Sequence, residues 1–146
     1  MESDKPPVVG LVSRFSKKIC LIVCDNVKKV VINKLFQTHV AKGSEVHTDG
    51  YEIYNDLEQL GYIHKTVIHS HGLYAEDQDK DGICEVHCNS SEGIWSLLRP
   101  FLRAFRGLNK RNLKYYVRLF EYLYNCRVDK KSPQEMFKEM VVIKCK

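Results

Sequence analysis

The chain has 146 residues, 44% of them hydrophobic and 28% charged, which is typical of a soluble globular domain able to bury a core. It has no apolar run of the roughly 20 residues that a membrane span requires. Its first residues, MESDKPP, also lack the basic start and apolar segment of a signal peptide. We therefore expect an intracellular protein with no membrane partner.

The net charge of +5 is unevenly distributed along the chain. Residues 1–86 contain 10 Lys and Arg against 13 Asp and Glu, whereas residues 87–146 contain 13 against 5. A strongly basic second half is typical of a surface that faces a polyanion.

The expected elements follow in chain order. A polar lead, residues 1–7, is predicted to be disordered. Residues 8–15 and 18–25 are β-rich and predict a hairpin around Ser16 and Lys17. Helical spacing over 26–40 and 51–60 predicts two helices, and 45–48 and 62–68 predict strands. Residues 69–86 are expected to form a polar loop.

Three further helices are predicted towards the C-terminus. The first covers residues 87–106, with a kink or break at Pro100, and the second covers 110–125. The third begins at Ser132, where Glu135 completes a capping box. This order predicts an α/β (α+β) fold with a mixed sheet covered by helices. Residues 8–128 would form its main domain, and 129–146 a C-terminal helix and tail.

The helix over residues 87–106 has an apolar face opposite a polar face. The polar face contains Asn89, Glu92, Ser96, Arg99, Arg103 and Arg106. One acid followed by arginines suits a metal ligand beside a nucleic-acid backbone. Helix capping is the alternative, because the spacing from Asn89 to Glu92 is that of a capping box and a first-turn glutamate suits the helix dipole.

Asp49 closes a short predicted strand and precedes Gly50. A carboxylate at the end of a strand lies where α/β sheets commonly bind ligands. The alternative is a plain Asp-Gly turn. Together with a glutamate on a helix, however, a strand-end aspartate could hold a divalent cation of the kind that assists phosphoryl transfer.

Cysteines and a second acidic cluster offer other metal sites. The pairs Cys20/Cys24 and Cys84/Cys88 are spaced as CxxxC, but the first pair lies in the apolar run ICLIVC, which favours buried, reduced thiols. The sequence DQDKDG over 77–82 opens like a calcium-binding loop, yet Cys88 occupies the twelfth position, where such loops have glutamate.

The stretch VHTDGYEIYNDLEQLGYIHKTVIHSHGLY, followed by HCNSSEGIWSLLRPFLR, resembles the DDE transposases of the ISXO-like insertion-sequence family, to which eukaryotic Merlin transposases are related. PPVVGLVSR, TDGYEIY, NSSEGIW and YLYN occur in the expected order, from about Pro6 to Arg127. The resemblance implies an RNase H-like fold lacking its first strand. It also implies Mg²⁺- or Mn²⁺-dependent cleavage and transfer of DNA strands, with transposon ends and target DNA as partners.

The resemblance further implies that Asp49 and Glu92 are catalytic metal ligands, that Arg99 contacts DNA, and that Asn89 and His87 support the site. From their charge, Arg103, Arg106 and Lys110 would add DNA contacts. The location would be the bacterial cytoplasm, or the nucleus for a Merlin-like remnant. Assembly into a homo-oligomer is left open.

One departure from the family pattern shapes the functional expectation. The family's first catalytic aspartate lies on a strand before the PPVVG strand, near which this chain begins. We therefore expect a truncated transposase domain that is inactive alone. Two alternatives remain: a domesticated, non-catalytic module that binds DNA or a protein, and a small metal-binding protein that uses the cysteines or the acidic loop.

Overall fold

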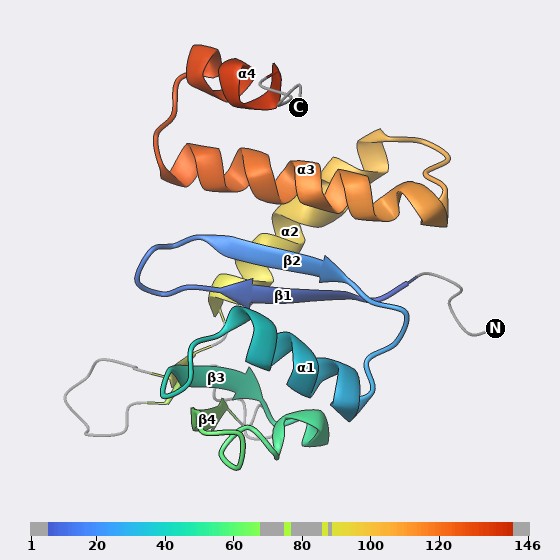
Figure 1. Ribbon diagram of the computed structural model, residues 1–146. Helices are drawn as coiled ribbons and strands as arrows, with labels where there is room; N and C mark the ends of the chain where they lie inside the picture. The colour runs from blue at the N-terminus through green and yellow to red at the C-terminus, as the bar shows by residue number, and fades with distance from the viewer. Residues whose placement is uncertain (1–5, 68–74, 77–85, 88, 142–146) are drawn as a thin grey trace, which may run out of the picture. The chain divides into compact units, whose positions relative to one another are not determined.

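The computed structural model describes residues 6–67, 75–76, 86–87 and 89–141 (Figure 1). Short strands followed by helices confirm the predicted α/β class. The chain forms two compact units, which divide within helix α2 (Asn89–Ala104) and are described separately. None of the helices in the described ranges has the length and apolar character needed to cross a lipid bilayer.

The two units have opposite charge. Met1–Val23 and Ser96–Lys146, the basic unit, contain 17 Lys and Arg against 6 Asp and Glu. Cys24–Trp95, the acidic unit, contains 6 against 12. The unit that contains most of the basic second half of the chain therefore also includes the N-terminal hairpin.

In the basic unit, β1 (Val8–Val12) and β2 (Ile19–Val23) form the predicted antiparallel hairpin. The strand predicted over 8–15 is too long by three residues. β1 ends at Val12 because residues 13–18 form a turn closed by two backbone hydrogen bonds of Ser13, one with Lys18 and one with Lys17.

Helix α3 (Lys110–Val128) lies against β2. Aromatic contacts join it to the α2 segment, with Phe101 and Phe120 ring centroids 5.3 Å apart. The helix starts where predicted because the Asn109 side chain accepts a hydrogen bond from the Arg111 N–H at 3.0 Å. The buried side chains of this unit are Ile19, Leu21, Leu98, Val117, Phe120 and Cys126.

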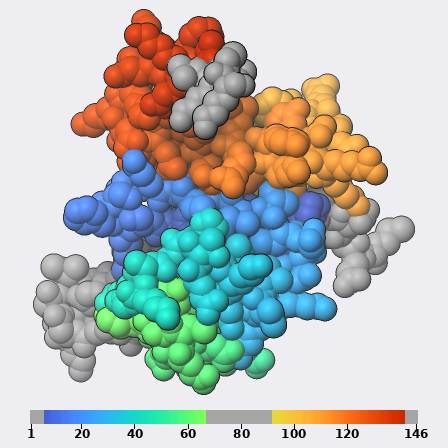
Figure 2. All heavy atoms as spheres, in the orientation of Figure 1, coloured from blue at the N-terminus to red at the C-terminus, as the bar shows by residue number. Residues whose placement is uncertain are grey.

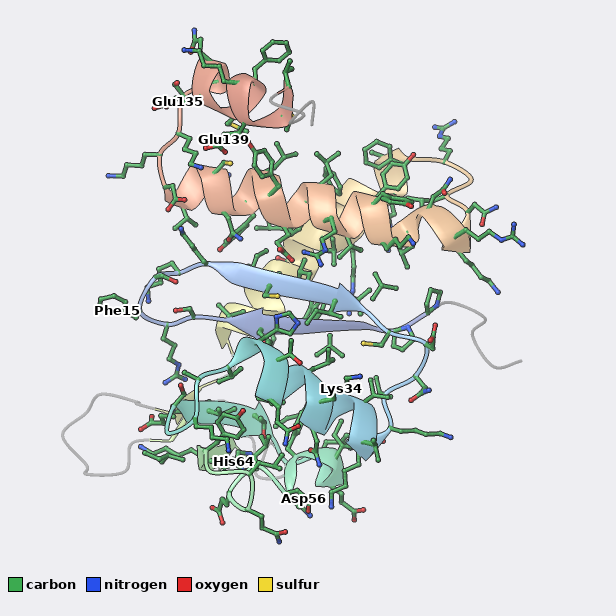
Figure 3. All side chains as sticks on the ribbon, in the orientation of Figure 1. Phe15, Lys34, Asp56, His64, Glu135 and Glu139 are labelled. Carbon is green, nitrogen blue, oxygen red and sulfur yellow. The ribbon has the colours of Figure 1, made fainter. Side chains whose placement is uncertain are left out.

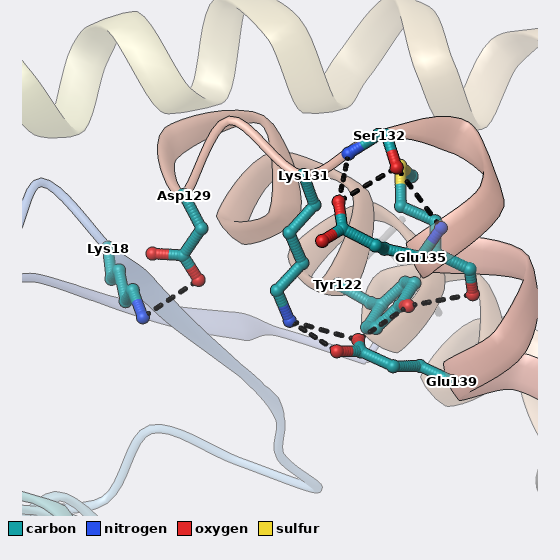
Figure 4. Close-up of polar contacts among 8 residues, drawn as sticks. Lys18, Tyr122, Asp129, Lys131, Ser132, Glu135 and Glu139 are labelled. Carbon is teal, nitrogen blue, oxygen red and sulfur yellow. Dashed lines mark hydrogen bonds and ion pairs between the residues drawn. The ribbon is translucent and has the colours of Figure 1, made fainter.

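Helix α4 (Pro133–Val141) confirms the predicted capping box (Figure 4). The Ser132 N–H donates to Glu135 Oε2 at 2.7 Å, and the Glu135 N–H donates to Ser132 Oγ at 3.3 Å. The Tyr122 hydroxyl of α3 donates to Glu139 at 3.0 Å, and Lys131 pairs with the same carboxylate. These contacts fix α4 against the C-terminal half of α3.

The acidic unit contains α1 (Lys29–His39), β3 (Glu45–Asp49) and β4 (Ile63–Val67). β3 and β4 are parallel, with Asp49 opposite Val67 (Figure 1). β6 (Val86–His87) lies against β4 and pairs antiparallel with β5 (Ala75–Glu76). The buried hydrophobic side chains of this unit are Cys24, Ile32, Phe36, Leu57, Tyr62 and Ile94.

The prediction of a helix over residues 51–60 is wrong. Only Glu52–Tyr54 forms a short 3₁₀ helix, η1, and turns follow it. The Leu57 N–H donates to the Tyr54 carbonyl and the Gly61 N–H to the Glu58 carbonyl, which are spacings of tight turns rather than of an α-helix. These turns let Leu57 reach zero exposure.

Other differences concern residues 69–106. β5 and Val86 of β6 fall in the segment predicted as a polar loop, since two-residue strands leave no periodic signal in a sequence. His87, predicted as the first residue of the helix, belongs to β6, and the helix begins at Asn89. α2 continues through Pro100, so the helix is not broken there. Pro100 is exposed, and water can satisfy a carbonyl that loses its bond at such a position.

Within the described residues the strands form separate two-stranded ladders, β1–β2, β3–β4 and β5–β6. They do not form the single mixed sheet that was expected. The RNase H-like arrangement therefore stays a prediction for this chain.

Candidate metal and nucleic-acid sites

Asp49 is the last residue of β3, and its side chain is exposed. Its Oδ1 accepts the Tyr51 N–H at 3.4 Å, a long contact of the kind found in Asx turns. Among the described residues no cation pairs with this carboxylate. The structure thus agrees in part with the alternative of an Asp-Gly turn. The second carboxylate oxygen of Asp49 remains able to bind a ligand.

Glu92 lies in the first turn of α2 and is also exposed. It belongs to the acidic unit, as Asp49 does. The side chains of Asn89 and of His87, expected to support the site, lie outside the described side chains, and so does the capping-box alternative for Glu92. In the described part of the chain no ion pair engages the Glu92 carboxylate either.

Strand contacts within the acidic unit bear on the two candidate acids. β4 pairs with β3, which ends at Asp49, and also contacts β6, which precedes α2 by a single residue. Within the described residues, no group of three or more metal-ligating side chains comes together. The structure therefore offers two separate exposed carboxylates and no third ligand beside them in these ranges.

A polar cluster that the sequence analysis missed lies next to Asp49. The Thr48 hydroxyl donates to the Asp49 carbonyl at 2.9 Å and contacts His64 Nε2 at 2.8 Å. Because the Thr48 proton is donated to that carbonyl, the contact with His64 fits an Nε2–H that donates to the Thr48 oxygen. The Thr66 hydroxyl lies 3.4 Å from the same nitrogen.

Burial is the main cause that lowers the pKa of His64, and the negative charge of Glu58 partly opposes it. A neutral imidazole is therefore favoured at this position, which suits its role as a hydrogen-bond donor to Thr48. The cluster fixes the backbone where β3 delivers Asp49. The runs of consecutive polar residues HTD and HKT in the two strands were the available signal, but the cluster also needs the parallel register of the strands.

A second set of polar contacts includes the start of β3. His47 Nε2 lies 2.5 Å from Glu45, and Lys65 Nζ lies 3.4 Å from the same carboxylate. The hydrogen bond with His47, assisted by Lys65, lowers the pKa of Glu45. Because side chains alternate along a strand, Asp49 shares its strand face with Glu45 and His47.

The predicted DNA-contacting residues lie together in the basic unit. Arg99 and Arg103 lie on α2, Arg106 follows that helix, and Lys110 begins α3. All four are exposed. Further exposed cations on α3 are Arg111, Lys114 and Arg118.

Apolar packing explains why these cations face solvent. The Phe105 and Tyr116 ring centroids lie 4.6 Å apart, and Leu98 and Val117 are buried. The α2 segment and α3 therefore use their apolar faces for packing, which leaves their basic residues exposed. An exposed cationic surface on paired helices suits contact with phosphates.

The cysteines give no sign of a metal site in the described residues. Cys24 and Cys126 are buried, Cys20 is half-buried, and none of the three forms a disulfide. Burial raises the pKa of the Cys20 and Cys24 thiols, which disfavours the thiolate that metals bind. The remaining three cysteines and the 77–82 acidic loop lie outside the described residues.

The family described as "ISXO2-like transposase domain" matches residues 1–125. The chain is also 29% identical over 119 residues to a protein of Halobacterium salinarum described as "Uncharacterized protein in transposable element ISH50". That match covers 81% of this chain and 38% of the relative, so the chain spans well under half of the relative's length. With most of its length matched, this protein belongs to the ISXO2-like transposase domain family.

Proposed function

We propose that this chain is a DDE-type transposase domain whose family activity is metal-dependent cleavage and transfer of DNA strands. The observation that supports this most is the family match over residues 1–125, which includes Asp49 at the end of β3 and Glu92 in the first turn of α2. Asp49 and Glu92 would be two of three catalytic carboxylates.

The two acids fit Mg²⁺ or Mn²⁺ in kind. Both offer exposed carboxylate oxygens, the ligands that hard divalent cations prefer, and a magnesium site often uses one or two carboxylates together with substrate phosphate oxygens. A bound divalent cation would activate the attacking hydroxyl and stabilise the leaving oxygen. Asp49, positioned by the Thr48–His64 cluster, and Glu92, on a rigid helix, would orient it.

A DDE site uses three acids, and within the described residues no third acid groups with Asp49 and Glu92. We therefore propose that the chain has little activity by itself. The outer edge of β1 is a position at which another strand could pair. The outer edge of β2 is occupied, because Leu21 N–H donates to Glu121 at 2.6 Å, whereas in the described residues β1 pairs with β2 alone.

Metal binding tests the proposal without requiring activity. Water-proton relaxation with Mn²⁺ should report binding to the intact chain, and Asp49→Asn and Glu92→Gln should each weaken it. Glu52→Gln is the matched control, because Glu52 is an exposed acid three residues from Asp49. Equal losses in all three variants would contradict the assignment.

Cleavage provides the second test. The chain with Mg²⁺ or Mn²⁺ and DNA containing the element's ends should give no product alone. Robust cleavage by this chain alone would refute the proposed inactivity.

A non-catalytic DNA-binding module is the second candidate. The observation that favours it is that the basic residues of α2 and α3 are all present and exposed, while no third acid lies beside the two candidates in the described ranges. Arg103→Glu and Arg106→Glu should then weaken DNA binding and flatten its dependence on salt. Lys34→Glu, at an exposed position of the acidic unit, is the control and should have little effect. Unchanged binding in the arginine variants would reject this surface.

A further inference from the structure

The turn between β1 and β2 holds a defined conformation. The Ser13 N–H donates to the Lys18 carbonyl at 2.9 Å, and the Lys17 N–H donates to the Ser13 carbonyl at 2.8 Å. The Ser13 hydroxyl also accepts the Ser16 N–H at 3.1 Å. Lys17 adopts a left-handed conformation with φ of 60°, which closes the turn. Figure 2 shows this turn as a blue projection on the surface.

Phe15 lies at the tip of this turn and points away from the ribbon (Figure 3). Its exposed fraction is 101%, so the residue is as accessible to solvent as in an extended peptide. Phe137, on α4, is exposed by 67%. Single exposed hydrophobic residues are common, but a phenylalanine fully exposed at a fixed hairpin tip offers both ring faces to a ligand.

The hairpin that presents Phe15 is anchored on α3. The Ile19 N–H donates to Asn125 Oδ1, and Asn125 Nδ2 donates to the Ile19 carbonyl, both at 2.9 Å. Lys18 pairs with Asp129 at 3.0 Å (Figure 4). The side chain at the tip therefore extends from a rigid support.

Two residues of the tip are cationic, and a third, Lys18, is paired with Asp129. Arg14 and Lys17 flank Phe15, and the tip belongs to the basic unit with its 17 Lys and Arg against 6 Asp and Glu. An aromatic ring between cations matches a nucleic acid, in which phosphates lie on either side of bases that present flat faces. A protein surface would need an apolar pocket with acidic edges.

We propose that the β1–β2 turn is a second DNA contact, in which the Phe15 ring stacks on an unpaired or displaced base while Arg14 and Lys17 contact the adjacent phosphates. The inference rests on the proposed DNA-binding function. It adds a contact to a base that has left the duplex stack. Strand cleavage and transfer would create such unstacked bases.

The position of the turn sets the length of DNA required. The turn lies at the C-terminal end of α3, where Lys18 pairs with Asp129, whereas Lys110 begins the same helix. The 19 residues of α3 span about 28 Å. At 3.4 Å per base pair this corresponds to about 8 base pairs between the basic helices and the tip.

The test compares a duplex of about 16 base pairs, twice that span, with the same duplex containing one unpaired 2-aminopurine at its centre. Phe15→Ala should weaken binding to the unpaired-base DNA by about 5- to 150-fold, leave binding to the perfect duplex within about twofold, and abolish quenching of 2-aminopurine fluorescence. Phe15→Tyr should retain the preference, because it keeps the ring. The slope of affinity against salt should not change, since no charge is removed.

Phe137→Ala is the matched control, because it removes an exposed phenylalanine from the same unit. An equal loss in Phe137→Ala, or no loss in Phe15→Ala, would overturn the stacking contact. If Phe15→Ala causes no loss but Arg103→Glu still weakens duplex binding, the proposed DNA surface stands and only the stacking contact fails. A parent chain that binds neither DNA would overturn both. A loss of self-association in Phe15→Ala, seen by sedimentation with unchanged DNA binding, would instead assign the tip to a protein contact.

Discussion

Replacing Asn125 tests how the hairpin is held on α3. Its side chain makes two hydrogen bonds of 2.9 Å to the backbone of Ile19, a residue 106 positions away in the chain. Ile19 is only 4% exposed, so water would not readily replace either partner after an Asn125→Ala change. Each hydrogen bond contributes about 1 kcal/mol net, and each unsatisfied buried group costs about 1–3 kcal/mol.

We expect Asn125→Ala to lower the free energy of unfolding by about 2–4 kcal/mol, after a gain of about 0.5 kcal/mol from the better helix propensity of alanine. Urea unfolding should show this as a midpoint about 1–2 M lower. Hydrogen exchange measures the same contact locally, and the Ile19 amide should lose its protection in the variant.

Asn112→Ala is the matched control, because Asn112 is an exposed residue of the same helix. It shares the change in helix propensity but makes no contact with β2 in the described set of hydrogen bonds. Our account of the hairpin anchor would be wrong if the two variants unfolded at the same urea concentration and Ile19 stayed protected in both.

Three further substitutions test other parts of the fold. Leu57→Ala should lower the free energy of unfolding by about 2–5 kcal/mol, since Leu57 has no exposure, while Leu97→Ala, at a half-exposed position, should cost far less in the same urea assay. Ser132→Ala should cost about 1 kcal/mol through loss of the α4 cap, and the thermal midpoint should fall accordingly. His64 has a pKa below the value of 6.5 that it takes in the unfolded chain, so stability should be complete above pH 6.5 and fall as pH drops through the folded-state pKa. His64→Gln should flatten this dependence in urea titrations at successive pH values, and an unchanged slope would contradict it.

Local signals in the sequence were sufficient for several elements. The Ser132 to Glu135 capping box is confirmed because each of its bonds joins residues three apart. The hairpin and α3 were recognisable because their patterns repeat over many residues. The strand that ends at Asp49 was found because a β-rich run meets an Asp-Gly pair.

Contacts between distant residues account for what the sequence did not reveal. The Thr48–His64 contact requires the parallel register of β3 and β4, and the Asn125–Ile19 contact joins residues 106 positions apart. Phe15 was predicted as a strand residue, because its β-propensity is high and the turn around it depends on the left-handed Lys17. A β-propensity describes one residue at a time, whereas the conformation of a turn depends on four or more residues together.

The separation of charge between the two units bears on both proposed functions. The acidic unit holds both Asp49 and Glu92 but has twice as many acidic as basic residues, so on its own it repels phosphates. The basic unit has a net positive charge that favours contact with phosphates, and it contains neither Asp49 nor Glu92. If both proposals hold, replacing Asp49 or Glu92 should remove the proposed chemistry and leave the proposed DNA binding intact.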